Sequence, residues 1–265
     1  MKEILREFFG YGGYLREPEG VFSWQHLTFT LSLVAVMIIL GIILGLKYKN
    51  KTDKEKNKVL IWAALLIDGF ELFKLIIFYT RSPEMNTIIN NLPLFLCSIQ
   101  LITIPLAAFS KGRIKEASLD FVFIFGLLGG VLGTVLALQN YACYPVISMD
   151  NVVSGITHTI SGFASLYIGV SGLSSMKKNI MWIAFVILCA FAVIAYPINV
   201  KFGTNYMFLM RDDGTPYSIF YNMVNGHKVF YPIIVVGTLI LYIFIFNFIY
   251  HLSNKKKALK KIMVK

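Results

Sequence analysis

Apolar residues occur in seven long blocks that are separated by short polar segments. The blocks run at about 22–46, 59–80, 92–110, 117–139, 152–173, 180–200 and 229–252. Each block has about the twenty residues that a helix needs to cross a hydrocarbon core. Lipid offers no partner for unpaired backbone groups, and the blocks lack the alternation of barrel strands, so helix is the expected element. The pattern predicts an all-α membrane bundle of about seven transmembrane helices.

Composition supports a membrane protein over other classes. Hydrophobic residues make up 57% of the chain and charged residues 15%, whereas soluble domains carry roughly 25% charged residues. This excludes a soluble enzyme and a disordered chain. Three cysteines, Cys97, Cys143 and Cys189, give no disulfide framework. The first twenty residues contain no cleavage-type segment, so we expect the first block to be retained in a single integral membrane domain, 1–265.

The net charge of +11 is unevenly distributed along the chain. Segments after the first, third and fifth blocks, together with the tail 253–265, hold 17 Lys and Arg, against 7 in the alternate set. This bias predicts an external N-terminus, a cytoplasmic C-terminus and a multi-pass protein of the cell membrane. It indicates no nucleic acid. Membrane lipids are the expected solvent or substrate, and the sequence identifies no protein partner.

The external segment 201–228 is longer than an ordinary connector. Connections of this length without structure are uncommon and often carry function. Two interpretations stay open: a lid that folds back over the helix ends, or an ordered amphipathic ledge.

The second block contains three charged residues at steps of three: Asp68, Glu71 and Lys74. This spacing places them along one side of a helix, where charges in a membrane are costly. Glu71 and Lys74 can form a structural ion pair. The functional alternative is a proton or cation relay, or a charged site that faces an internal cavity.

The fifth block carries a polar stripe: Ser154, His158, Ser161 and Ser165. Serines alone would indicate close helix packing. His158 is a candidate general base, because the pKa of an imidazole lies near neutrality.

The third block begins near Pro93, which suits the first turn of a helix, so we expect this helix to start at Leu92. Cys97 and Gln100 then share a face. Buried cysteines are usually inert, and a reactive one needs a base beside it. Because the third and fifth blocks run in the same direction, Cys97 and His158 are expected at matching depth.

Further polar residues near the external side could join the same cavity. They are Gln25, His26, Gln139, Asn140 and Asn205. The fourth block has a glycine stripe, Gly126, Gly129, Gly130 and Gly133, which predicts close helix contact. No phosphate loop, zinc-ligand spacing or serine nucleophile elbow is present, so no cofactor and no metal site are expected.

Four pieces of the sequence resemble one family. They are Phe22-Ser23-Trp24-Gln25-His26-Leu27, Asn91-Leu92-Pro93-Leu94-Phe95-Leu96-Cys97-Ser98, His158, and Gly203-Thr204-Asn205-Tyr206-Met207-Phe208-Leu209. Together they look like the YwaF-type bacterial integral membrane proteins, relatives of eukaryotic transmembrane protein 164. The resemblance covers nearly the whole block pattern, and the string 203–209 is its most specific part.

The resemblance implies acyl transfer on lipids, with Cys97 as nucleophile and His158 as its partner. Phe95 departs from the family pattern, since members often carry a polar residue there, commonly His. Oxyanion stabilisation would come from Gln100, Asn205 or backbone amides. The residues expected to bind substrate or support the site are His26, Gln100, Asn205, Tyr206, Asp68 and Glu71.

A second hypothesis comes from a different class of protein. The chain would be a non-enzymatic solute-binding or transport protein, with Asp68, Glu71 and the external polar cavity as its substrate site.

Overall fold

The computed structural model describes residues 2–174 and 176–263, which form helices, turns and connecting loops without a strand. The chain forms two compact units, Met1–Ser175 and Met176–Lys265. The single integral membrane domain expected from the sequence stays a prediction.

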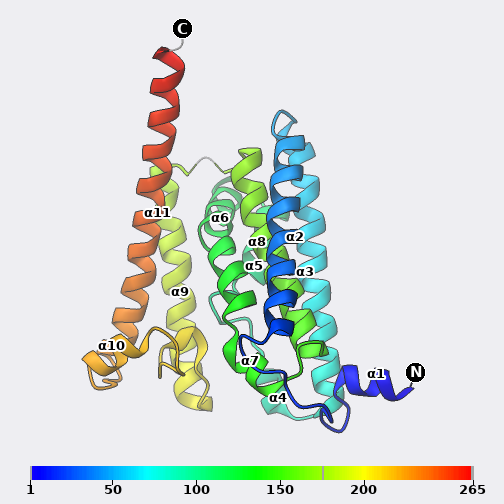
Figure 1. Cartoon of the computed structure of the whole chain (residues 1–265). Coiled ribbons are helices and arrows are strands. Elements are labelled where there is room, and N and C mark those ends of the chain that lie inside the picture. Colours follow the sequence, from blue (N-terminus) through cyan, green and yellow to red (C-terminus); the bar gives the residue numbers. More distant parts are fainter. Residues whose placement is uncertain (1, 175, 264–265) are drawn as a thin grey trace. The chain divides into compact units, whose positions relative to one another are not determined.

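The first unit contains eight helices in its described residues (Figure 1). They are α1 (Lys2–Phe9), α2 (Trp24–Tyr48), α3 (Asp53–Arg81), α4 (Met85–Ile89), α5 (Gln100–Phe109), α6 (Gly112–Val135), α7 (Leu138–Cys143) and α8 (Met149–Ser171). Thr52 and Glu55 form a reciprocal capping box that starts α3. The left-handed Gly172 ends α8, a conformation that glycine adopts without steric cost.

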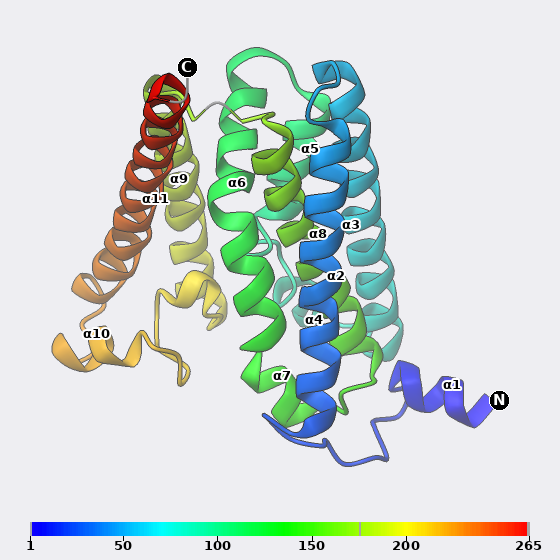
Figure 2. The same cartoon turned by 45° about the horizontal axis from the view of Figure 1, so that its top comes forward.

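Helix α8 is the central element of this unit, because it packs against α2, α3, α5 and α6 (Figures 1 and 2). Glycines allow these close approaches. A β-carbon on Gly130 of α6 would come within 2.8 Å of the Gly162 Cα on α8. The same fit continues at Gly126, where a β-carbon would meet the Ser161 carbonyl oxygen at 2.8 Å. The glycine stripe therefore makes the close helix contact that the sequence predicts.

The apolar core lies where α3, α5, α6 and α8 meet. It contains Leu60, Ala63, Ala64, Ile67, Ile104, Ala107, Ala108, Leu119, Val122, Ala164, Tyr167 and Ile168. The Tyr167 hydroxyl reaches the backbone of α3 and donates to the Lys56 carbonyl oxygen over 2.9 Å. Its polar end is thus satisfied inside the core.

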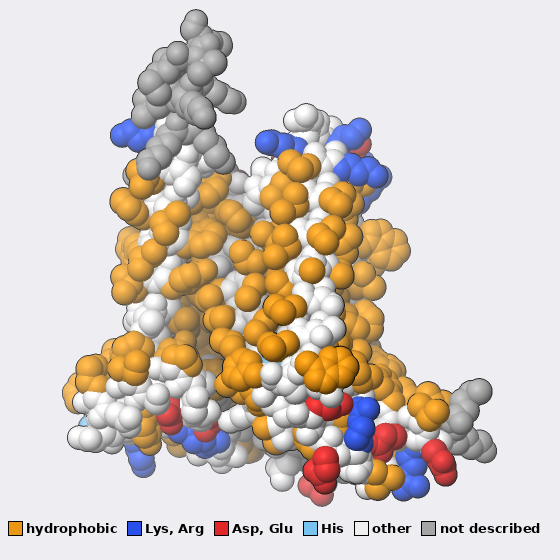
Figure 3. All heavy atoms as spheres, viewed as in Figure 1, with side chains coloured by type: hydrophobic (Ala, Val, Ile, Leu, Met, Phe, Trp, Pro, Cys, Tyr) orange, Lys and Arg blue, Asp and Glu red, His pale blue; other side chains and the backbone are white. Residues whose placement is uncertain are grey.

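Four helical stretches of the described chain are long and apolar enough to cross a membrane: Trp24–Tyr48, Gly112–Cys143, Ile180–Phe202 and Phe230–Lys255. In Figure 3, apolar side chains cover the middle of the first unit's helices, and charged side chains gather at their ends. The protein is therefore a helical membrane protein, as predicted. Helices α3 and α8 have 29 and 23 residues, but charged or polar side chains interrupt their apolar character.

The third predicted helix starts later than expected. The prediction of a start at Leu92 is wrong, because residues 90–99 form turns and α5 begins at Gln100. A proline disfavours helical backbone in the residue before it, which is consistent with the non-helical Leu92 before Pro93. Irregular backbone at membrane depth is tolerated only where protein or a cavity surrounds it.

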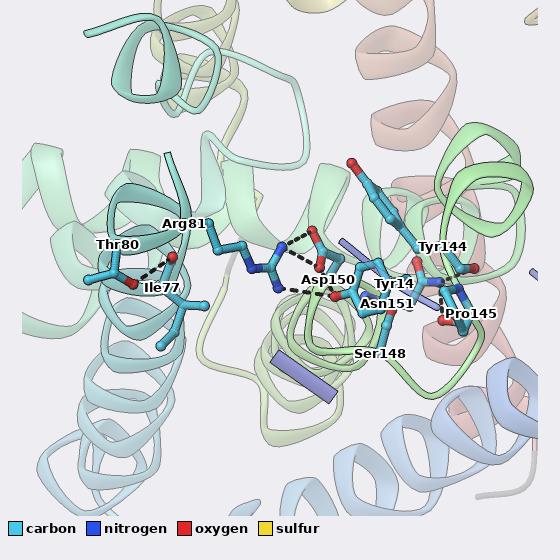
Figure 4. Close-up of polar contacts among 9 residues, drawn as sticks. All are labelled: Tyr14, Ile77, Thr80, Arg81, Tyr144, Pro145, Ser148, Asp150 and Asn151. Carbon is cyan, nitrogen blue, oxygen red and sulfur yellow. Dashed lines mark hydrogen bonds and ion pairs between the residues drawn. The ribbon is translucent and has the colours of Figure 1, made fainter. Parts of the chain in front are cut away.

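A buried polar cluster joins the end of α3 to the start of α8 (Figure 4). Arg81 Nη1 donates to both carboxylate oxygens of Asp150, over 2.8 and 3.2 Å. Arg81 Nη2 donates to the Tyr14 hydroxyl over 3.0 Å, and this hydroxyl in turn donates to Asp150. The Arg81 and Asp150 side chains are 16% and 6% exposed. The N-terminal segment is thereby fixed to the two helices.

The second unit contains α9 (Lys178–Phe202), the 3-10 turn η1 (Tyr206–Phe208), α10 (Ser218–Met223) and α11 (Phe230–Met263). Helices α9 and α11 pack together. Helix α11 continues well past the predicted end at residue 252, so the described part of the basic tail is helical. Residues 264–265 of the tail lie outside the described residues.

Candidate functional site

A small polar cavity lies inside the first unit, with a volume of about 40 Å³. Three segments line it: α3, the irregular stretch before α5 together with the first turn of α5, and α8. The lining residues are Ile67, Glu71, Lys74, Cys97, Ser98, Leu101, Ser154, Thr157, His158 and Ser161. Cys97 and His158, which were expected at matching depth, therefore line the same cavity.

The Cys97 thiol and the His158 ring lie close enough in this lining to interact electrostatically. His158 Nδ1 lies 2.7 Å from the Ser154 carbonyl oxygen. A carbonyl oxygen only accepts, so Nδ1 carries the proton of the neutral ring. Nε2 is then the nitrogen with a free lone pair, and it is the one available to the thiol.

Helix α6 shapes the wall behind these two residues through its glycines. A β-carbon at Gly133 would overlap the His158 ring, and one at Gly129 would lie 3.5 Å from both Cα and Cβ of Cys97. The His158 ring can therefore occupy its position only because residue 133 is a glycine. At position 129 a β-carbon would make only an ordinary van der Waals contact with Cys97. The stripe that packs α6 on α8 also positions the site.

Glu71 and Lys74 form an ion pair at this cavity, with 2.7 Å between Lys74 Nζ and Glu71 Oε1. Their side chains are 14% and 17% exposed. The pair predicted from the helical spacing is therefore confirmed, and both of its members line the cavity. The Lys74 charge is close enough to act electrostatically on His158.

Asp68 belongs to a second hollow of about 250 Å³. That hollow shares Glu71 and Leu101 with the smaller cavity and is otherwise lined by Asp68, Leu72, Leu75, Asn91, Pro93 and Ile102. Most of these side chains are apolar. The larger hollow therefore adjoins the polar cavity along one shared wall.

Two further predicted residues of the first unit are buried apart from the cavity lining. His26 accepts a hydrogen bond at Nδ1 from the Phe22 amide over 3.0 Å, and its ring packs 4.1 Å from that of Tyr141. Gln100 is fully buried; its Oε1 accepts from Thr103, and its Nε2 has no partner among the described residues. The His26 ring thus fixes the backbone just before α2. The Gln100 Nε2 amide group has no hydrogen-bond acceptor within the described chain.

Asn205 and Tyr206 lie in the second unit, in a tightly bonded loop. Asn205 Nδ2 donates to the Arg211 carbonyl oxygen and to Asp213 Oδ2, each over 2.7 Å. Its Oδ1 accepts from the amides of Met210 and Arg211. The amide of Tyr206 donates to Asn199, whose Nδ2 donates back to the Tyr206 carbonyl. The side-chain hydrogen bonds of Asn205 are therefore all used within the loop.

The sequence reasoning missed several residues of the cavity: Ser98, Leu101 and Thr157. It also gave Gly129 and Gly133 only a packing role. A signal existed for these glycines, because they lie four residues apart, one turn of a helix, as do Ser154 and His158. Which helix faces meet could not be read from one sequence.

No group of three or more His, Cys, Asp or Glu side chains that could hold a metal ion is found in the described chain. The site consists of one thiol, one imidazole, an ion pair and small hydroxyl side chains.

These features define a helical membrane protein with a thiol and an imidazole in an internal cavity. The chain belongs to the TMEM164 family, whose model matches residues 21–250. This confirms the relation to transmembrane protein 164, while the finer assignment to the YwaF type stays a prediction. No curated protein and no solved structure matches the chain.

Proposed function

We propose that this protein is a membrane acyltransferase that acts on lipids through Cys97 and His158. The observation that carries the proposal is that the Cys97 and His158 side chains line one cavity among apolar helices. A thiol with an adjacent base is the arrangement of an activated nucleophile. Family membership supports the same assignment through the activity that the resemblance implies.

The first half-reaction transfers an acyl group to the protein. His158 Nε2 takes the thiol proton, and the Cys97 sulfur attacks the ester carbonyl carbon of a donor lipid. The π-electron pair moves to the carbonyl oxygen and forms an oxyanion. When the carbonyl re-forms, the ester bond breaks, and the departing lipid alkoxide takes the proton from the His158 imidazolium. The products are a lysolipid alcohol and an acyl thioester on Cys97.

The second half-reaction returns the acyl group to another lipid. A hydroxyl of the acceptor gives its proton to His158 and attacks the thioester carbonyl. The sulfur leaves with the bonding pair and recovers the proton from the imidazolium, which restores the free thiol. The hydrogen bond from His158 Nδ1 to the Ser154 carbonyl supports this cycle, because it holds the ring and stabilises the imidazolium.

The broken third segment supports the proposal independently. Cys97 lies three residues before the start of α5, on irregular backbone between apolar helices. Non-helical backbone at this depth occurs where it lines a cavity, and helix starts present amide groups that favour negative charge. A thiolate at Cys97 would benefit from both. Gln100, the oxyanion donor expected from the sequence, has an unpaired Nε2 but lies outside the cavity lining.

The direct test is acyl transfer by the purified full chain in lipid nanodiscs. The probe is phosphatidylcholine with an alkyne-tagged acyl chain, with lysophospholipids of several headgroups as acceptors. Cys97→Ser and His158→Gln should each lower the rate by about 100-fold or more. Cys143→Ser and Cys189→Ser serve as matched controls, since neither thiol lines the cavity. Thioester adducts should form on the original protein and be missing in Cys97→Ser.

Full activity in both Cys97→Ser and His158→Gln would overturn the proposal. Saturable binding of a solute with no acyl transfer would instead favour the solute-binding or transport hypothesis.

We further propose that the chain crosses the cell membrane seven times. The third crossing would combine the irregular residues 90–99 with α5. The distribution of Lys and Arg supports an external N-terminus and a cytoplasmic C-terminus. A reporter before Lys2 should read external and one after Lys265 cytoplasmic. Both reporters on one side would exclude an odd number of crossings.

A further inference from the structure

The Lys74 ammonium has more donor capacity than its ion pair uses. Its Nζ lies 2.7 Å from Glu71 Oε1 and 5.9 Å from the centre of the Phe78 ring. A lysine ammonium has three N–H donors. Among the described residues this ammonium pairs with Glu71 alone, which leaves N–H donors free on a side chain that lines the cavity.

Among the described residues, Lys74 is the one Lys or Arg side chain in the lining of this cavity. A charge in a membrane-spanning segment is costly, and such residues face a bundle interior or a water-filled space where they serve a function. An ion pair with a purely structural role would not need to line the same cavity as the Cys97 thiol. The position of Lys74 beside Cys97 and His158 therefore indicates a chemical role.

The volume of the cavity limits the size of the chemical group that Lys74 can contact there. The cavity has a volume of about 40 Å³. One water molecule needs roughly 10–15 Å³ on the same measure, so the cavity has room for a few small atoms or groups. This is enough room for an ester carbonyl group. The adjoining hollow of about 250 Å³ offers room for the remainder of a lipid next to the shared residues Glu71 and Leu101.

We propose that the Lys74 ammonium stabilises the oxyanion that forms when Cys97 attacks the acyl carbonyl, and that Glu71 positions Lys74. This rests on the proposed acyl transfer. The ammonium faces the oxygen that receives the π-electron pair, and it gives up no proton. The negative charge disappears again when the carbonyl re-forms and the alkoxide leaves with the proton from His158. A cation held in a fixed position beside the reacting carbonyl is an effective stabiliser of such charge.

Three variants separate this role from a structural ion pair. Removing one partner would leave a buried charge unpaired and could prevent folding. The double variant Glu71→Gln/Lys74→Met removes both charges, and Glu71→Lys/Lys74→Glu keeps a pair but moves the cation by three residues. Lys74→Arg keeps the cation in place. Folding of each is checked by thermal unfolding and by gel filtration in the same detergent.

Both double variants should fold and lose about 100-fold or more in kcat, with KM changed by less than about threefold. Lys74→Arg should retain the most activity of the three. Alkylation of Cys97 by the small neutral reagent iodoacetamide should stay within about threefold of the original rate in all three, because this reaction forms no oxyanion. Alkylation thus reports whether the thiol and His158 are still in place.

Full acyl transfer by either folded double variant would overturn this inference while leaving the proposed function intact, provided that Cys97→Ser is inactive. Loss of alkylation along with acyl transfer would also overturn it, because Lys74 would then only hold Cys97 and His158 in position. An active Cys97→Ser variant would instead refute the proposed function itself.

Discussion

The ring of His158 lies directly against the backbone of Gly133, in space that a β-carbon at this position would occupy. One stripe of glycines on α6 therefore has two consequences. It allows α6 and α8 to pack closely, and it leaves the volume in which the imidazole faces Cys97.

Alanine substitutions along this stripe should separate the two effects. Gly133→Ala places a methyl group on the His158 ring, and such overpacking typically costs about 1–3 kcal/mol. We expect acyl transfer to collapse, because the ring must move away from Cys97. Gly129→Ala creates only ordinary contacts of 3.5 Å with Cys97 and should keep most activity.

Gly69→Ala on α3 is the matched control, since no atom lies within 4 Å of its would-be β-carbon. It should leave the rate unchanged and raise thermal stability slightly, because alanine favours a helix interior over glycine by about 0.5–1 kcal/mol. Equal activity of Gly133→Ala and Gly69→Ala would show that the ring position is irrelevant to the reaction.

The Arg81–Asp150 ion pair should contribute more to stability than a pair with one solvent-exposed carboxylate. Asp150→Asn leaves the Arg81 guanidinium without its counter-ion in a mostly buried position, at a cost of about 3–5 kcal/mol. The pair Lys56–Asp53 offers the comparison: the Lys56 side chain is 9% exposed, but its partner Asp53 is 87% exposed and lies 3.8 Å away. Asp53→Asn should cost about 1 kcal/mol or less. Thermal unfolding in one detergent measures both, and similar shifts would contradict the burial argument.

Tyr14 should make stability sensitive to alkaline pH. Burial and the hydrogen bond to Asp150 raise the pKa of Tyr14 from 10.0 to about 12. The folded protein therefore holds this proton more tightly than the unfolded chain, so stability falls as pH rises between 10 and 12. The Tyr14→Phe variant has no such group. Its melting temperature should lie below that of the original at pH 8, and the difference should shrink above pH 10. A constant difference would show that Tyr14 does not titrate with unfolding.

The sequence predicted the apolar helices well, because twenty-residue apolar blocks leave few alternatives in lipid. The prediction of helix boundaries from the sequence was less accurate around the cavity. Helices α3 and α8 and the segment around Cys97 are interrupted by polar residues or irregular backbone, and these three line the cavity. The start of α5 was misplaced because Pro93 fits a turn as well as a first helical turn.

The spacing of Glu71 and Lys74 was sufficient to predict their ion pair, since three residues separate neighbours on one helix face. The same spacing could not reveal that the pair faces Cys97, which depends on how α3 packs against α8. Asn205 illustrates the opposite case. Its place in a family-specific string suggested a role at the site, whereas its four hydrogen bonds lie within its own loop.

Asn205 should therefore determine the rigidity of its loop. It is 7% exposed, donates to Arg211 and Asp213, and accepts from the amides of Met210 and Arg211. Asn205→Ala removes all four bonds, each worth about 0.5–1.5 kcal/mol. The loop should open more often, and trypsin should cleave after the half-exposed Arg211 faster by about 10-fold or more, since this rate follows the open population. Asn222→Ala on α10 is the control, because that side chain is exposed. If trypsin cleaves both variants at the same rate, contacts other than those of Asn205 hold the loop. If only Asn205→Ala is cleaved faster, the Asn205 side-chain amide is the group that keeps the loop ordered.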